Sequence, residues 1–217
     1  MLDTATQRAT MVAAQLRPND VTDSHIRHAM LTVPRERFVP TGFVPVAYME
    51  STIPLAPDRV LLDPRSFAKL LQLANVGPNE RVLDVGCGTG YSTAVLSLLG
   101  REVVGLEAHA DLAALATKNL ATSGLANTRI VSGPLASGCP TDAPFDVIFL
   151  NGAIECEPKE LLGQLSDGGR LVAILRNGAA GHAIVYLNHQ GALGERTAFD
   201  AAAPVLPGFA KPRGFVF

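Results

Sequence analysis

Hydrophobic residues in the first part of this 217-residue chain recur at helical spacing. Residues 9–16 carry such a pattern up to a break at Pro18, and residues 26–33 carry a second one that ends at Pro34. Prolines at positions 40, 45, 54 and 57 exclude long regular elements before Pro64. We therefore expect residues 1–63 to form an N-terminal cap that is helical at first and then irregular.

From residue 64 onward the pattern alternates between strands and helices. Asp63 and Pro64 combine a side-chain acceptor at a helix N-cap with proline at the first helical position, which predicts a helix through Ala74. Buried strands then alternate with helices around residues 94–99 and 112–120. The strand candidates are Val82–Val85, Val103–Leu106, Thr128–Val131, Phe145–Leu150 and Leu171–Leu175. This alternation favours a doubly wound, mostly parallel α/β sheet with helices on both faces and ligands at the carboxyl ends of its strands.

The last part of the chain predicts a different edge to this sheet. Short apolar segments at Ala183–Leu187 and Gly214–Phe217 are connected through glycine and proline instead of helices, which indicates antiparallel strands. A hydrophobic content of 47% is sufficient for one core. We expect a single domain over residues 1–217, in which residues 64–217 form the α/β core.

Charge and composition exclude several classes of function. The balance of 18 basic and 20 acidic residues gives no reason to expect nucleic acid or an anionic membrane as a partner. The polar N-terminus and the lack of a long apolar run predict a cytoplasmic protein. Three cysteines and five histidines are scattered, which fits neither a disulfide framework nor a metal site. The composition carries no signal of the oligomeric state.

The clearest chemical signal is a glycine-rich turn over residues 82–91, which read VLDVGCGTGY. Glycines after a buried strand let the backbone pass close to a ligand at a helix N-terminus, although a lone glycine turn is weak evidence. Here Glu107 closes the next predicted strand about twenty residues further on, where a ribose-binding acid is expected. The combination predicts a nucleotide-like cofactor.

Two residues distinguish between the possible cofactors. A dinucleotide site needs glycine or alanine at the sixth position of its motif, where this chain has Tyr91. Asp84 places a carboxylate just before the turn, where it would repel a pyrophosphate and attract the ammonium and sulfonium of S-adenosylmethionine. Charge therefore favours the methyl donor.

Further landmarks accompany this turn in order along the chain. In the N-terminal half they are Arg8, Met11-Val12, Gln15-Leu16, Ala29-Met30, Val33-Pro34-Arg35-Glu36, Phe38-Val39-Pro40, Ala47-Tyr48 and Ile53-Pro54-Leu55. Downstream they are Asp84 to Tyr91, Thr93 to Leu96, Pro144-Phe145-Asp146, Gln164-Leu165 and Gly168 to Val172. In this combination the chain resembles the protein-L-isoaspartate O-methyltransferase family.

The resemblance implies a seven-stranded methyltransferase sheet and an enzyme that uses S-adenosylmethionine to esterify the α-carboxylate of isoaspartyl residues in damaged proteins or peptides. Such a carboxylate is already ionised at neutral pH, so alignment matters more than a strong base. The residues expected to bind the cofactor are Asp84, Gly86, Cys87, Gly88, Gly90, Tyr91, Glu107, Ala108, Pro134 and Leu135. Among these, Glu107 would face the ribose and Pro134-Leu135 the adenine edge.

The chain departs from the family on the acceptor side. The family typically reads Gly-Gln-Thr-Ile-Ser-Gln-Pro where residues 58–64 read DRVLLDP, so Leu62 falls on the functional serine. Asp58 and Asp63 add negative charge beside an anionic substrate. The acceptor-side candidates are therefore Leu62, Asp63 and Asn151, which ends the fourth strand where the family commonly has threonine. A simpler interpretation is that Leu62 packs and Asp63 caps a helix, and no residue is assigned catalysis.

Three functions remain open on these residues. The first is an isoaspartyl carboxyl methyltransferase that tolerates Leu62. The second is a methyltransferase of the same fold with another acceptor, because a neutral or cationic molecule suits Asp58 and Asp63 better than a carboxylate does. The third is a non-catalytic cofactor-binding module, since an adenine-side aspartate of the family is also replaced by Pro134.

Overall fold

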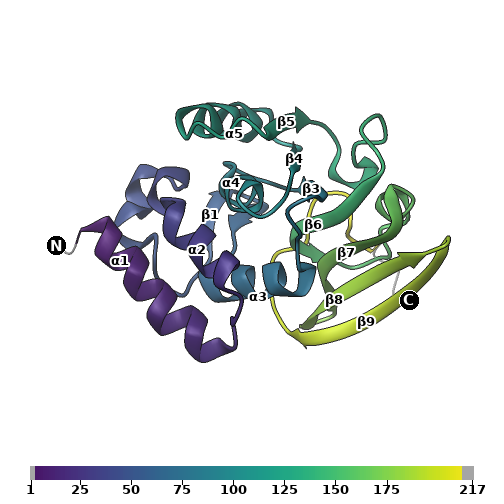
Figure 1. Ribbon diagram of the computed structural model, residues 1–217, viewed down its shortest axis with the longest axis horizontal. Coiled ribbons are helices and arrows are strands. Elements are labelled where there is room, and N and C mark those ends of the chain that lie inside the picture. The colour runs from purple at the N-terminus through teal and green to yellow at the C-terminus, as the bar shows by residue number, and fades with distance from the viewer. Residues whose placement is uncertain (1–2, 212–217) are drawn as a thin grey trace, which may run out of the picture.

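A seven-stranded sheet organises the computed structural model, which describes residues 3–211. Its strand order is β5-β4-β3-β6-β7-β8-β9 (Figure 1). The strands are β3 (Arg81–Val85), β4 (Glu102–Glu107), β5 (Thr128–Ser132), β6 (Phe145–Ile154), β7 (Leu165–Asn177), β8 (Ala180–His189) and β9 (Ala192–Asp200). Strands β3 to β7 pair in parallel, whereas β8 and β9 are antiparallel. The doubly wound, mostly parallel sheet with an antiparallel edge is thus confirmed.

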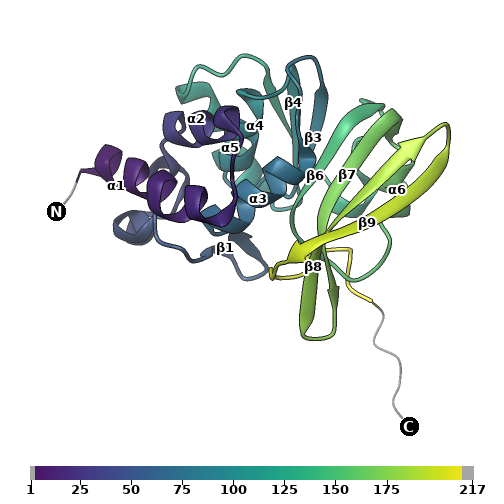
Figure 2. The ribbon, with the colours of Figure 1, turned by 60° about the horizontal axis from the view of Figure 1, so that its bottom comes forward.

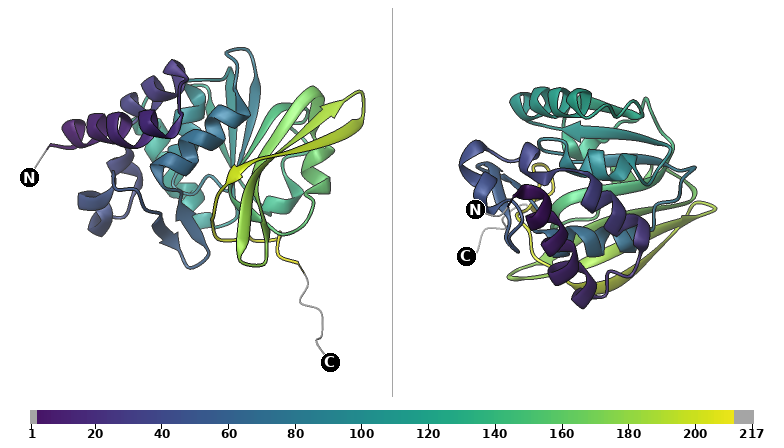
Figure 3. Two further views of the ribbon diagram at one scale, coloured as in Figure 1. Left: turned by 90° about the horizontal axis from the view of Figure 1, so that it is seen from below. Right: turned by 60° about the vertical axis from the view of Figure 1, so that its left-hand side comes forward.

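The predicted helical cap is also present. It consists of α1 (Thr4–Met11), which continues into η1 (Val12–Leu16) and η2 (Arg17–Asn19), then α2 (Ser24–Thr32), η3 (Arg35–Phe38) and η4 (Thr41–Val46). The cap helices lie at one end of the molecule, opposite β8 and β9 (Figures 2 and 3). Side chains at Asp3 and Asp23 accept hydrogen bonds from the first turns of α1 and α2, which explains where these helices begin.

A β-hairpin follows the cap, in the segment that was expected to be irregular. Within residues 3–211, strands β1 (Ile53–Ala56) and β2 (Arg59–Leu61) pair only with each other, as a separate two-stranded sheet. Prolines are tolerated in such short edge pairs, because a missing N–H there breaks no interior ladder. The prolines thus limit the length of the strands without preventing them.

The two faces of the main sheet have separate hydrophobic cores. Helices α3 (Pro64–Ala74), α4 (Tyr91–Ser97) and α5 (Ala110–Thr122) cover one face, on which alternate strand residues such as Val82 and Val103 point at them. The intervening residues, such as Leu83 and Val104, pack under η5 (Leu135–Ser137), α6 (Lys159–Leu162) and the side chains of Leu206 and Phe209. Strands buried on both faces are typical of doubly wound folds, and this arrangement leaves the carboxyl ends of β3 and β4 as the natural ligand edge.

The C-terminal edge differs in detail from the prediction. Strand β9 was not predicted, because its side chains are almost all exposed and it carries no alternating apolar pattern. It is held by backbone pairing to β8. The predicted strand at Gly214–Phe217 lies outside the described residues. Over residues 3–211 no helix is both long enough and apolar enough to cross a bilayer.

Candidate active site

The glycine turn is fixed between the ends of two strands. Strand β3 ends at Val85, and the N–H groups of Gly86 and Cys87 both donate to the carbonyl of Leu106 at 2.7 and 3.1 Å. Gly86, Gly88 and Gly90 have φ values of +73°, +58° and +93°, which glycine adopts without strain. The turn is therefore held against the carboxyl end of β4, where Glu107 is the last residue.

Glu107 faces this turn as predicted. Its side chain is 0% exposed, and the carboxylate accepts a 2.7 Å hydrogen bond from the Gly88 N–H. The N–H groups of Ala108 and His109 donate to the other carboxylate oxygen at 2.9 and 3.2 Å. We call Gly86, Gly88 and the Glu107 carboxylate the glycine cradle. Three backbone donors make it a strong site for a buried negative charge.

Arg59 of the hairpin neutralises this carboxylate. Its Nη2 lies 3.1 Å from Glu107 Oε2, its Nε lies 3.3 Å from both oxygens, and Nη2 also donates to the Gly86 carbonyl. Both side chains are buried, with 1% and 0% exposed. A Cβ placed on Gly86 would come within 2.6 Å of Arg59 Nη2, and one on Gly88 within 2.7 Å of Leu55 Cδ1. Side-chain tips of the hairpin thus occupy the space in front of the cradle.

The sequence interpretation missed Arg59. The departure of segment 58–64 from the family lies in its missing hydroxyl groups, and no role was predicted for its one basic residue. A usable signal existed, because two carboxylates, Asp84 and Glu107, were expected at one sheet edge. Buried carboxylates require a cationic partner or several donors.

Asp84 lies behind the turn and is fully buried. Its carboxylate accepts hydrogen bonds from Ser92 Oγ at 2.7 Å, Thr93 Oγ1 at 2.6 Å and Asn151 Nδ2 at 2.5 Å. Burial raises the pKa of Asp84 to about 6, against these hydrogen bonds and the charge of Arg59, which lower it. Side chains already satisfy Asp84, so it favours a cation through its charge more than through a vacant oxygen.

Replacing Asn151 by alanine should make the stability of the protein more sensitive to pH. The raised pKa of Asp84 means that the folded protein binds this proton more tightly than the unfolded chain, so its contribution to stability falls as the pH rises from 3.8 to about 6. Losing the Asn151 hydrogen bond to the ionised form raises that pKa further. We expect the substitution to cost about 1.5–3 kcal/mol at pH 8 and less at pH 5, as measured by urea unfolding.

Asn127→Ala is the matched control, because Asn127 Nδ2 donates to the uncharged Ser97 carbonyl at 2.9 Å. Its cost should be the same at both pH values. Equal costs of Asn151→Ala at pH 5 and pH 8 would show that Asp84 does not titrate in this range.

The three acceptor-side candidates have structural partners. Leu62 is 2% exposed and packs in the core on the cap side, and its carbonyl accepts from Arg35 Nη2 at 2.7 Å. Asp63 accepts from the Ser66 N–H at 2.9 Å and caps α3. Asn151 binds Asp84, as above. These contacts match the simpler interpretation for Leu62 and Asp63, and the nearby Asp58 pairs with His109 at 2.8 Å.

Asp63→Ala should remove the N-cap of α3. We expect a loss of about 1 kcal/mol in the free energy of unfolding, which is the usual value for an aspartate N-cap. Asp63→Asn keeps an acceptor for the Ser66 N–H and should be close to wild type in the same urea titration. A loss of enzymatic activity in fully folded Asp63→Ala protein would instead place Asp63 at the acceptor.

The remaining predicted cofactor residues lie beside the cradle or pack in the cores next to it. Ala108 is exposed beside Glu107, and Gly133, just before Pro134, donates to the Glu107 carbonyl at 3.0 Å. Leu135 is buried in the second core. The ring of Tyr91 packs against Phe38 and Phe67 on the cap side, away from the cradle. Burial raises the pKa of the Cys87 thiol, so this group stays protonated and is a poor nucleophile.

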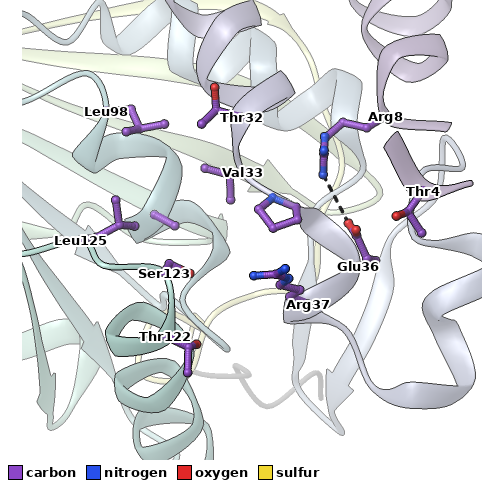
Figure 4. Close-up of a pocket in the computed structure, with 12 residues that line it drawn as sticks. Thr4, Arg8, Thr32, Val33, Glu36, Arg37, Leu98, Thr122, Ser123 and Leu125 are labelled. Carbon is purple, nitrogen blue, oxygen red and sulfur yellow. Dashed lines mark ion pairs between the residues drawn. The ribbon is translucent and has the colours of Figure 1, made fainter. Parts of the chain in front are cut away.

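A cavity of about 510 Å³ lies elsewhere, between the cap, the end of α4 and the end of α5 (Figure 4). None of the predicted cofactor residues line it. Its charged lining residues are Arg8, Glu36 and Arg37, of which Arg8 and Glu36 are 3.7 Å apart and both contact the Tyr48 hydroxyl. This network connects α1 to η3 and is best explained as a structural junction.

Comparisons with known proteins agree with this architecture. The profile of the protein-L-isoaspartate(D-aspartate) O-methyltransferase family matches residues 7–193. A protein-L-isoaspartate O-methyltransferase of Koribacter versatilis is 39% identical over 168 residues, which cover 77% of this chain and 76% of that protein. One of Herpetosiphon aurantiacus is 37% identical over 191 residues, which cover 88% and 85%.

Solved structures show the same fold. A protein-L-isoaspartate O-methyltransferase matches with a TM-score of 0.79 at 24% identity, covering 93% of this chain and 66% of that one. A Plasmodium falciparum protein assigned to the same family, in complex with S-adenosyl-L-homocysteine, matches with a TM-score of 0.79 at 19% identity and covers 95% and 99%. By its sequence profile and its relatives, the chain belongs to the protein-L-isoaspartate(D-aspartate) O-methyltransferase family.

Proposed function

We propose that this chain is an S-adenosylmethionine-dependent methyltransferase that esterifies the α-carboxylate of isoaspartyl residues in proteins or peptides. The observation that carries the proposal is the buried Glu107 carboxylate, held 2.7 Å from the Gly88 N–H at the end of β4 and facing the glycine turn. Relatives that are named for this activity match more than three quarters of the chain, which supports the same acceptor class.

The cradle fits the methyl donor chemically. A cation with several N–H donors, the Arg59 guanidinium, already lies between the Glu107 carboxylate and the Gly86 carbonyl. S-adenosylmethionine carries an ammonium and two ribose hydroxyls, which donate to the same kinds of acceptor, and a sulfonium, which is stabilised by nearby negative charge. Glu107 would hold the ribose hydroxyls, and the Gly86 carbonyl with the charge of Asp84 would favour the cationic end. The groups in front of the cradle, Arg59 and Leu55, are side-chain tips and can move without a change in the sheet.

The chain's own residues have a limited chemical task. When bound, S-adenosylmethionine supplies an electrophilic methyl group. The acceptor carboxylate is ionised at neutral pH, so the protein has to align it and exclude water, and needs no strong base. This agrees with a site in which Leu62 is apolar, Asp63 caps a helix and Asn151 supports Asp84.

The test uses methyl-labelled S-adenosylmethionine with a matched pair of peptides, one containing isoaspartate and one aspartate. We expect label on the isoaspartyl peptide alone. Calorimetry with S-adenosylhomocysteine in the same preparation separates the two ways of failing. Binding without transfer to either peptide would indicate a methyltransferase with another acceptor. The apolar Leu62, in place of the family's serine, is consistent with that alternative. Absence of binding would contradict methyltransferase function.

A further inference from the structure

We propose that Arg59 is the residue that binds the acceptor carboxylate. Its guanidinium pairs with Glu107 in this structure, and it pairs with the isoaspartyl α-carboxylate once the ribose has taken its place on Glu107. This inference rests on the proposed function. It names the group that replaces the serine missing at Leu62.

The first argument is the charge of the segment around Arg59. An anionic acceptor at residues 58–64 would meet two aspartates and four apolar residues, and Arg59 is the one cation there. Asp58 is paired with His109, and the side chain of Asp63 caps α3. Arg59 also offers a planar set of donors that matches a carboxylate in two-point contact, as a serine hydroxyl cannot.

The second argument is position. Arg59 Nη2 is over Gly86, so close that a Cβ there would come within 2.6 Å of it, and its charge lowers the pKa of Asp84. The guanidinium therefore lies between the glycine cradle and the β1–β2 hairpin, which ends directly before Leu62.

The third argument is competition for Glu107. Arg59 and the ribose hydroxyls need the same carboxylate oxygens, so Glu107 can serve the ribose only after Arg59 has left it. A guanidinium that loses its counter-ion and stays beside the turn is an unpaired cation, which an anionic acceptor can neutralise. Because β2 pairs only with β1, Arg59 can withdraw without breaking the main sheet. Binding of the cofactor should thus create the acceptor site.

The test compares Arg59→Gln, which is the family's residue at this position, with Arg59→Lys, which keeps the charge. Arg65→Gln is the control, because Arg65 is half exposed and pairs with Glu50 at the surface. The first measurement is the affinity for S-adenosylhomocysteine by calorimetry. We expect Arg59→Gln to bind up to about tenfold more tightly than wild type, because Glu107 no longer has to release a counter-ion.

The second measurement is binding of an isoaspartyl peptide to protein saturated with S-adenosylhomocysteine, which requires no turnover. We expect Arg59→Gln to lose roughly 10- to 100-fold in peptide affinity, as for a lost charged hydrogen bond. Arg59→Lys should recover part of this loss, and Arg65→Gln should bind like wild type. Steady-state transfer should show the same effect as an increase in the peptide KM.

The outcomes separate this inference from the proposed function. Unchanged peptide affinity in Arg59→Gln would overturn it, and so would weaker binding of S-adenosylhomocysteine, which would make Arg59 a support for the cofactor. Wild-type protein that binds no isoaspartyl peptide would overturn it as well. If wild type binds the peptide but transfers no methyl group, the proposed function fails, and the loss of peptide affinity in Arg59→Gln still supports the role of Arg59.

Discussion

Replacing Glu107 by glutamine is expected to lower the free energy of unfolding by about 3–5 kcal/mol and to abolish cofactor binding. The substitution leaves the Arg59 guanidinium, 1% exposed, without its counter-ion, and removal of one partner from a buried ion pair has costs of this size. The glutamine amide also brings an N–H group toward three backbone N–H donors. Chemical denaturation and calorimetry with S-adenosylhomocysteine measure the two effects.

The Arg59→Gln variant provides the control for this loss. Glu107 keeps its hydrogen bonds from the N–H groups of Gly88, Ala108 and His109, so removing Arg59 should cost less than removing Glu107. The double variant should be more stable than the sum of the two single losses implies, because it contains no unpaired charge. Additive losses would show that the two side chains do not interact in solution.

Gly90→Ala is expected to destabilise the protein by about 2–5 kcal/mol. Gly90 has a φ of +93°, where an L-residue costs about 1–2 kcal/mol, and its new Cβ would lie 3.2 Å from Ala116 Cβ and 3.3 Å from Ala116 Cα. Helix backbone cannot yield as a side-chain tip can, so overpacking adds about 1–3 kcal/mol. Chemical denaturation gives the total.

Gly124→Ala separates the cost of the positive φ from the cost of crowding against α5. Gly124 has a φ of +67°, and a Cβ added to it would meet no heavy atom within 4 Å, so only the backbone strain should appear. The difference between the two variants then measures the crowding against α5. Equal losses would mean that α5 moves away from the turn at little cost.

The sequence predicted the cradle because its parts are local to two parallel strands. Val85 pairs with Leu106, so the spacing along the chain places Glu107 directly beside the turn once β3 and β4 are neighbours. Buried apolar segments predicted both strands, and the glycines predicted the turn between β3 and α4. The same reasoning could not show which glycine is crowded by neighbouring atoms, because the contact of Gly90 with α5 depends on how that helix packs.

Other features depend on contacts that no local pattern records. Arg59 is buried only because the hairpin folds back over the turn, 48 residues before its partner Glu107 in the chain. Strand β9 forms by backbone pairing, which leaves no periodic trace in its exposed side chains. Tyr91 was predicted to bind the cofactor because it belongs to the motif. In the structure its ring packs against Phe38 of η3 and Phe67 of α3.

The separation of the β1–β2 hairpin from the main sheet divides the molecule into parts of unequal local stability. A pair of strands with four and three residues is marginal on its own, so side-chain contacts such as the Arg59–Glu107 pair must hold it closed. The backbone hydrogen bonds of the hairpin can open in small local fluctuations. Those of β3 and β4 lie within the seven-stranded sheet, so they open only in much larger unfolding events. The frequency of those small openings sets how often solvent and solutes reach the turn.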